Sequence, residues 1–187
     1  DANPLTHLPG NVSILGELQN RIDKKNPFAV AYCDLDKFKV YNDKYGFKHG
    51  DEIIRETARL LIRATKEFGN TDDFIGHIGG DDFVIVTTPD KADQIGQKIV
   101  EEFEKIAPSF YTEEDKAAGF IVGHDRKGVE QKFGLLSISI GIVSNEKREL
   151  THVAQIAELG AELKEAAKRI ERSSVVKDKR SDSRQDV

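Results

Sequence analysis

The chain has 187 residues, 33% of them charged, and a formal net charge of -5. This length suits one domain with a sizeable core. The acidic balance argues against nucleic-acid binding, which needs a basic surface. No apolar run approaches the roughly 18 residues of a membrane-spanning helix, so we expect no direct membrane contact. The single Cys33 cannot form an internal disulfide, and a reducing, cytoplasmic setting fits.

Apolar residues at helical spacing predict four helices, over residues 11–24, 50–68, 89–107 and 151–170, and a short helical turn over 41–46. Asn11 and Thr151 are the expected N-caps of the first and the last helix. Basic side chains, Lys164 among them, load the end of the last helix, where they favour the helix dipole. Beyond it, the polar stretch from Ser173 reads as a mobile tail.

Three stretches predict β-structure. Residues 28–33 are continuously apolar, as in a central strand covered on both faces. Residues 74–86 predict a β-hairpin with Gly79 and Gly80 at its tip, because only glycine takes a positive φ without strain. A second hairpin is expected within residues 108–143, with Phe133–Val143 as its long second strand. The order helix, strand, helix, strand, strand, helix indicates an α+β fold: a ferredoxin-like or nucleotidyl-cyclase-like antiparallel sheet flanked by helices, plus an extra hairpin.

Acidic residues end two of the predicted strands. Asp34 and Asp36 follow the first strand, and Asp81 and Asp82 lie at the hairpin tip. If these strands are neighbours, Asp34 and Asp81, with Asp82, form a carboxylate site for magnesium, which usually also holds substrate phosphates.

Phosphate-binding groups are expected beside this site. Backbone N–H groups of residues 37–39 can face phosphates. Lys168 and Arg172, one helical turn apart on one face, can reach them from the side. Together these are the ingredients of nucleotidyl transfer.

Each feature alone has a simpler structural explanation. The Gly-Gly-Asp-Asp tip can be an ordinary solvated turn. Asp34 and Asp36 can cap the following turn, and Lys168 and Arg172 can lie on a solvated helix face. Only the combination favours a functional site.

The combination resembles the GGDEF family of diguanylate cyclases over nearly the whole chain. Five motifs occur in the family's order: the lead-in over residues 1–9, which has extra residues, the stretch from Asp34 to Asp51, which has matching spacing, the tip Gly79–Phe83, Ser139–Gly141 and the pair Lys168 and Arg172.

The resemblance implies a class III nucleotidyl-cyclase-like domain over residues 1–172 that condenses two GTP into cyclic di-GMP and releases pyrophosphate. Each protomer would present one GTP, so catalysis would require a homodimer. The first residue is Asp1 and the chain contains no Met. We therefore expect a fragment whose upstream regulatory domain is missing, the cytoplasmic output domain of a bacterial signalling protein.

The resemblance also implies residue roles. Asp34, the carbonyl of Leu35 and Asp81 would hold Mg²⁺, or alternatively Mn²⁺, with Asp82 in support. Asp81 and Asp82 would be the catalytic pair, with Asp81 accepting the proton of the attacking 3′-hydroxyl. Asn42 and Asp51 would bind the guanine edge, whose donors adenine lacks. The whole expected substrate-binding set is Lys37, Phe38, Lys39, Asn42, Phe47, Asp51, Gly79, Gly80, Lys168 and Arg172.

Four positions depart from the family pattern. Asp82 stands where Glu is usual, His77 where Arg is common and Phe47 where His is common. Asn70 replaces the arginine of the R-x-x-D product-inhibition site, of which Asp73 remains. A neutral amide cannot make the bidentate charged contact, so we expect weak or absent feedback inhibition.

Three alternatives stay open at this point. A degenerate domain would bind GTP or cyclic di-GMP and regulate a neighbouring domain without turnover. A purely structural dimerisation module would bind no nucleotide. A cyclase using ATP is disfavoured by Asp51.

Overall fold

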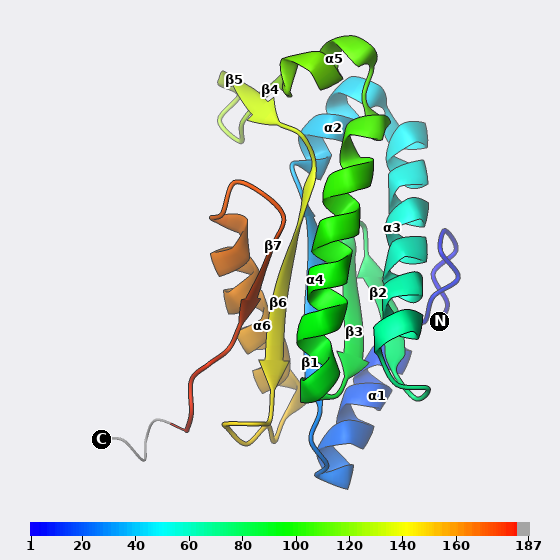
Figure 1. The fold of residues 1–187 in the computed structure, drawn as a ribbon, viewed down its shortest axis with the longest axis vertical. Coiled ribbons are helices and arrows are strands. Elements are labelled where there is room, and N and C mark those ends of the chain that lie inside the picture. Colours follow the sequence, from blue (N-terminus) through cyan, green and yellow to red (C-terminus); the bar gives the residue numbers. More distant parts are fainter. Residues whose placement is uncertain (183–187) are drawn as a thin grey trace.

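The structure, a computed structural model, describes residues 1–182 as a five-stranded sheet flanked by helices, with a small two-stranded sheet at one end (Figure 1). The strand order is β2-β3-β1-β6-β7. In that order the strands are Phe74–Gly79, Asp82–Thr87, Ala29–Asp36, Ser137–Ser144 and Ser174–Lys177. The first four run antiparallel to their neighbours, and β7 runs parallel to β6. The expected α+β class and extra hairpin are confirmed, and the sheet is mixed rather than wholly antiparallel.

The four predicted helices and the predicted helical turn are present with shifted ends, and the structure adds a short helix over residues 113–118 that the sequence does not predict. They are α1 (Asn11–Lys24), α2 (Phe38–Tyr45), α3 (Phe47–Phe68), α4 (Pro89–Ile106), α5 (Glu113–Ala118) and α6 (Val153–Lys168), with a 3₁₀ turn at Ala107–Phe110. The two predicted N-caps are wrong: Gly10 and His152 occupy the cap positions, and neither makes a side-chain cap bond. Within residues 1–182, no helix is both long and apolar enough to cross a membrane.

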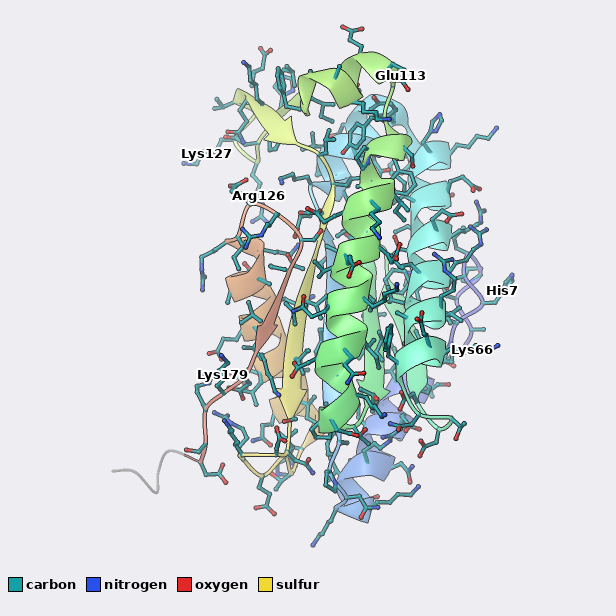
Figure 2. All side chains as sticks on the ribbon, viewed as in Figure 1. His7, Lys66, Glu113, Arg126, Lys127 and Lys179 are labelled. Carbon is teal, nitrogen blue, oxygen red and sulfur yellow. The ribbon has the colours of Figure 1, made fainter. Side chains whose placement is uncertain are left out.

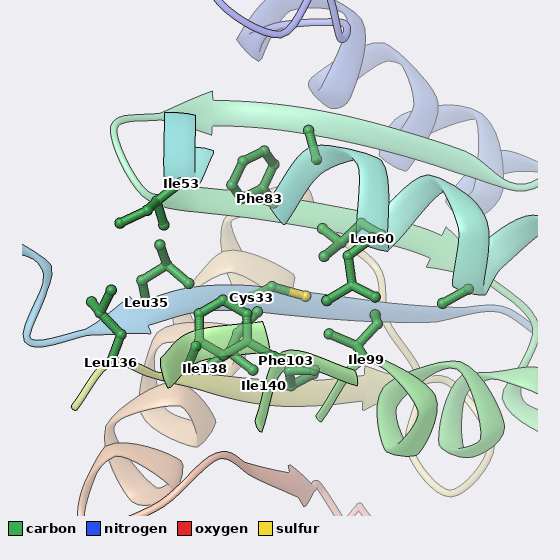
Figure 3. Packing of buried hydrophobic residues seen from close by; sticks show 14 of the residues in the cluster. Cys33, Leu35, Ile53, Leu60, Phe83, Ile99, Phe103, Leu136, Ile138 and Ile140 are labelled. Atoms are coloured by element: carbon green, nitrogen blue, oxygen red, sulfur yellow. The ribbon is translucent and has the colours of Figure 1, made fainter. Parts of the chain in front are cut away.

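Alternation along β1 divides the core into two layers. Ala29, Ala31, Cys33 and Leu35 pack with α3 and α4 on one face, part of which Figure 3 shows. Val30 and Tyr32 pack with α1 and α6 on the other face. Because successive side chains of a strand point to opposite faces, Asp34 and Asp36 continue the row that faces α1 and α6. Charged side chains such as Lys66 and Arg126 project outward (Figure 2).

The expected long strand Phe133–Val143 is wrong. The chain forms β5 (Glu130–Gly134), which pairs with β4 (Phe120–His124), and then begins β6 in the main sheet at Ser137. Leu136 lies between the two strands, buried, and its N–H donates to the Tyr111 hydroxyl at 2.8 Å. That side-chain acceptor replaces a ladder partner, so the strand is interrupted here.

The expected mobile tail from Ser173 is wrong for residues Ser174–Lys177. They form β7, and Val175 packs against the core of the α4 face. The Ser174 hydroxyl also donates to the carbonyl of Ala167 at 3.0 Å. A four-residue edge strand has too short an apolar pattern to stand out in a polar stretch. The rest of that expectation includes residues 183–187, which lie outside the described residues.

Candidate functional site

Three carboxylates meet where β1 ends beside the hairpin tip. The register pairs Asp34 with Asp82 of β3 on one side and with Ser139 of β6 on the other. One oxygen each of Asp34, Asp81 and Asp82 lies within 4.8 Å of the others. The structure therefore brings these predicted metal ligands together, as expected for neighbouring strands.

Two lysines of α6 lie over the same strand ends. Lys164 Nζ is 3.1 Å from Asp82 Oδ1 and 3.7 Å from Asp34 Oδ2. Lys168 Nζ is 3.2 Å from Asp34 Oδ2, 2.9 Å from Asp36 Oδ1 and 3.3 Å from the carbonyl oxygen of Leu35. Residues four apart share one face of a helix, so both ammonium groups point into the carboxylates. The sequence reading assigned Lys164 only a helix-dipole role and missed this contact.

Asp36 has a different environment from Asp34 although both face α6. Its carboxylate accepts hydrogen bonds from Ser137 Oγ at 2.6 Å and Ser139 Oγ at 2.8 Å, besides Lys168. These partners saturate the buried group. Asp36 thus holds Lys168 in place, which gives the Ser139–Gly141 motif a structural reason.

The electrostatics of the cluster reflect crowded negative charge. Burial, followed by the charge of Asp81, raises the pKa of Asp34 to about 7. Burial and the charge of Asp82 also raise the pKa of Asp81. For Lys168, burial opposes the charged form, but the hydrogen bond to Asp36 and the nearby charges prevail and raise its pKa. A bound cation would relieve the repulsion among the carboxylates.

The hairpin tip is fixed by His77, a residue noted from sequence only as a departure. Its ring is buried, lies stacked 4.3 Å from that of Phe83, and bonds to the Gly80 carbonyl through Nε2 at 2.8 Å. Because a carbonyl only accepts, Nε2 is the donor of this bond, and Nδ1 forms a second hydrogen bond with the Thr6 hydroxyl at 2.8 Å. Gly80 has a left-handed φ of 51°, which explains the glycine at this turn. Thr6 in the lead-in motif was the signal that could have revealed this link.

The expected guanine-side residues lie on the α2–α3 corner that follows β1. Asn42 Oδ1 is buried and has no hydrogen-bond partner among the described residues. A Cβ on Gly50 would lie 1.9 Å from that oxygen, so the glycine makes room for Asn42. Asp51 and Phe47 are exposed, the latter at 77%.

The structure brings only some of the groups expected to bind phosphate close to one another. Lys37 takes a left-handed φ of 67° just before α2, while the side chain of Lys39 is exposed and pairs with Asp43 at 3.0 Å. The expectation that Lys168 and Arg172 share a helix face is wrong, because α6 ends at Lys168. The exposed Arg172 instead lines a hollow of about 320 Å³ together with Lys37.

Asn70 and Asp73, the remnant of the expected inhibitory site, bond to each other and to the start of α4. The Asn70 backbone N–H donates to Asp73 Oδ2 at 2.8 Å, and its side-chain amide donates to the Thr88 hydroxyl at 2.9 Å. Asp73 Oδ2 also accepts from Thr87 Oγ1 at 2.9 Å. Both side chains are therefore engaged in local hydrogen bonds.

Comparison with known proteins gives consistent matches. The family model described as "Diguanylate cyclase, GGDEF domain" matches residues 2–124. The chain is 30% identical over 110 residues to the signaling protein YkoW of Bacillus subtilis, covering 54% of this chain and 13% of that protein. It is 27% identical over 109 residues to the probable diguanylate cyclase DgcT of Escherichia coli, covering 56% and 23%.

Solved structures match over more of the chain. The GGDEF domain of TpbB (YfiN) from Pseudomonas aeruginosa has a TM-score of 0.68 at 21% identity, covering 95% of this chain and 94% of that one. The GGDEF domain of DgcB from Caulobacter crescentus, solved with c-di-GMP, has a TM-score of 0.66 at 19% identity, covering 94% of each. These neighbours share the fold. The chain spans less than a quarter of the length of YkoW and of DgcT.

Proposed function

Since the chain belongs to the GGDEF family, we propose that it is a diguanylate cyclase domain that condenses two GTP into cyclic di-GMP and releases pyrophosphate. The observation that carries this proposal is the meeting of Asp34, Asp81 and Asp82 at the end of β1. The name of DgcT and the c-di-GMP complex of DgcB support the same product. Because the chain covers a small share of YkoW and DgcT, we place it as an output domain in a larger cytoplasmic signalling protein.

The residues at the cluster fit a hard divalent cation, Mg²⁺ or Mn²⁺. All the candidate ligands are oxygens: the carboxylates of Asp34, Asp81 and Asp82 and the carbonyl of Leu35. The bound cation would neutralise phosphate charge as pyrophosphate leaves. Asp81, which lies at the hairpin tip beside Asp34 and Asp82, is the proposed acceptor of the 3′-hydroxyl proton.

The remaining residues would bind and orient GTP. Asn42 and Asp51 would hydrogen-bond the guanine edge. The Oδ1 atom of Asn42 has no hydrogen-bond partner among the described residues, which leaves an acceptor for a guanine donor. Lys37 and Arg172, which line one hollow, would hold phosphates beside the backbone after β1. One protomer presents one GTP, so the two reacting nucleotides come from two domains face to face.

Product analysis by mass spectrometry tests the proposal. The domain is fused to a strong dimeriser and incubated with GTP and Mg²⁺, beside an Asp81→Ala variant. Asp93→Ala is the matched control, because Asp93 is paired with Lys177 on the surface at 3.3 Å. We expect cyclic di-GMP from the parent and the control, and none from Asp81→Ala. Absence of product from the parent would refute the proposal.

One observation favours a second function, nucleotide binding without turnover. The ammonium of Lys168 contacts two expected metal ligands, Asp34 and the Leu35 carbonyl, and Asp82 is shorter than the usual Glu. A domain in which Lys168 keeps its contacts with Asp34 and the Leu35 carbonyl would bind GTP without converting it to product. Calorimetry that shows tight GTP binding beside zero product would select this alternative. Competition with ATP in the same assay tests the base preference.

A further inference from the structure

Lys164 is the residue at the carboxylate cluster that has no role so far. Its ammonium lies between Asp82 at 3.1 Å and Asp34 at 3.7 Å. Its side chain is only 18% exposed, so the charge is largely removed from solvent. A lysine this enclosed is retained where its charge is compensated.

Close packing of α6 on β6 fixes where Lys164 lies. A Cβ on Gly141 would come within 2.8 Å of Leu163 Cβ and 2.9 Å of the Lys164 backbone nitrogen. One helical turn earlier in α6, a Cβ on Gly160 would come within 2.2 Å of the Tyr32 ring. Two glycines thus let the helix approach the sheet, and the stem of Lys164 leads from this contact to the strand ends.

The charges around Lys164 can be counted in two groups. Asp36 is paired with Lys168 and two serine hydroxyls, and that pair is neutral. Asp34, Asp81 and Asp82 remain, and when all three are ionised they carry three negative charges against the single positive charge of Lys164; the contact of Lys168 with Asp34 at 3.2 Å does not change the total, because Lys168 is already counted with Asp36. The remainder matches the charge of one divalent cation.

We propose that Lys164 is an internal counter-cation that limits the carboxylate cluster to a single divalent metal ion. The inference rests on the metal site of the proposed function. Its ammonium takes the place beside Asp82 and Asp34 that a second metal ion needs, and it repels such an ion at short range. Asp82, shorter by one methylene than the usual Glu, then serves as the partner of Lys164 more than as a metal ligand.

Counting bound Mn²⁺ tests this proposal without any turnover. Electron paramagnetic resonance reports free Mn²⁺ during a titration of the domain, residues 1–187, without nucleotide. We expect one Mn²⁺ per chain for the parent. Lys164→Met, which keeps the length of the side chain and removes the charge, should bind two, with the first about tenfold tighter.

Two control variants separate the local effect from a change in net charge. Lys98→Met removes the same charge from the Lys98–Glu102 pair on α4 and should leave the stoichiometry at one. Lys164→Arg keeps the charge and should also bind one. Two Mn²⁺ per parent chain would overturn the inference even if Lys164→Met failed to fold. So would an unchanged count and affinity in Lys164→Met. Absence of any Mn²⁺ binding by the parent would instead refute the metal site of the proposed function.

Discussion

Removing the charge of Asp34 should stabilise the metal-free domain at pH 8 and not at pH 4.5. The perturbation is Asp34→Asn, which keeps the size of the side chain. Burial raises the pKa of Asp34 from an ordinary 3.8 to about 7. At roughly 1.4 kcal/mol per pH unit, the full shift of about three units corresponds to an upper limit of about 4 kcal/mol. Adjustment of the two flexible lysines and of solvent should reduce the observed gain to about 1–3 kcal/mol.

The direction in which stability changes with pH follows from the numbers of protons bound by the folded and the unfolded protein. The folded pKa lies above the unfolded one, so the folded protein holds more protons between about pH 4 and pH 7. Its free energy of unfolding therefore falls as pH rises through this window, and the loss is complete above it. Asp34→Asn does not lose stability in this way, because its side chain binds no proton in this pH range.

Urea denaturation followed by circular dichroism, in EDTA at both pH values, measures the difference. With Mg²⁺ at pH 8 the gain in stability of Asp34→Asn over the parent should shrink or reverse, because only the parent keeps all the metal ligands. A variant less stable than the parent at pH 8 in EDTA would show that the ion pairs with Lys164 and Lys168 outweigh the burial and repulsion. The same difference at both pH values would refute the assigned pKa.

Three further outcomes are expected. His77→Phe removes the hydrogen bonds from the His77 ring to the half-buried Thr6 hydroxyl and to the Gly80 carbonyl, so the free energy of unfolding should fall by about 1–3 kcal/mol in urea, at about 0.5–1.5 kcal/mol for each bond. Thr6→Val removes one of these two bonds and should cost less; an equal loss would contradict this account. Gly141→Val should push α6 from the sheet and cost about 1–3 kcal/mol, with weakened Mn²⁺ binding, whereas unchanged binding would show that the helix position is not critical. Added cyclic di-GMP should leave the initial rate of product formation unchanged, because Asn70 and Asp73 are engaged with each other; inhibition that Asp73→Ala abolishes would contradict this.

Much of the fold was predictable because its signals are local. The continuous apolar run before Asp34 predicts a central strand, and β1 is central and buried. The glycine pair predicts the tip between β2 and β3, and Gly80 takes the expected positive φ. Each prediction depends on a few adjacent residues and on backbone conformations that few residue types adopt.

The features missed from sequence depend on distant partners. The strand break at Leu136 depends on Tyr111, 25 residues earlier, and β7 depends on the free edge of β6. The contact of Lys164 with Asp82 joins residues 82 positions apart. None of these partners can be inferred from the local pattern, because a polar stretch or a helix-end lysine has an adequate local explanation.

The contrast between Asp34 and Asp36 shows how such distant partners divide the work of a motif. A spacing of two places both carboxylates on the same face of β1, so the spacing cannot distinguish them. Ser137, Ser139 and Lys168 saturate Asp36. Asp34 instead faces Asp81 and Asp82, where burial and like charge raise its pKa to about 7. Asp34 lies where negative charge is in excess and is therefore the carboxylate suited to bind a cation. Asp36, two residues later, is suited to hold Lys168 beside it.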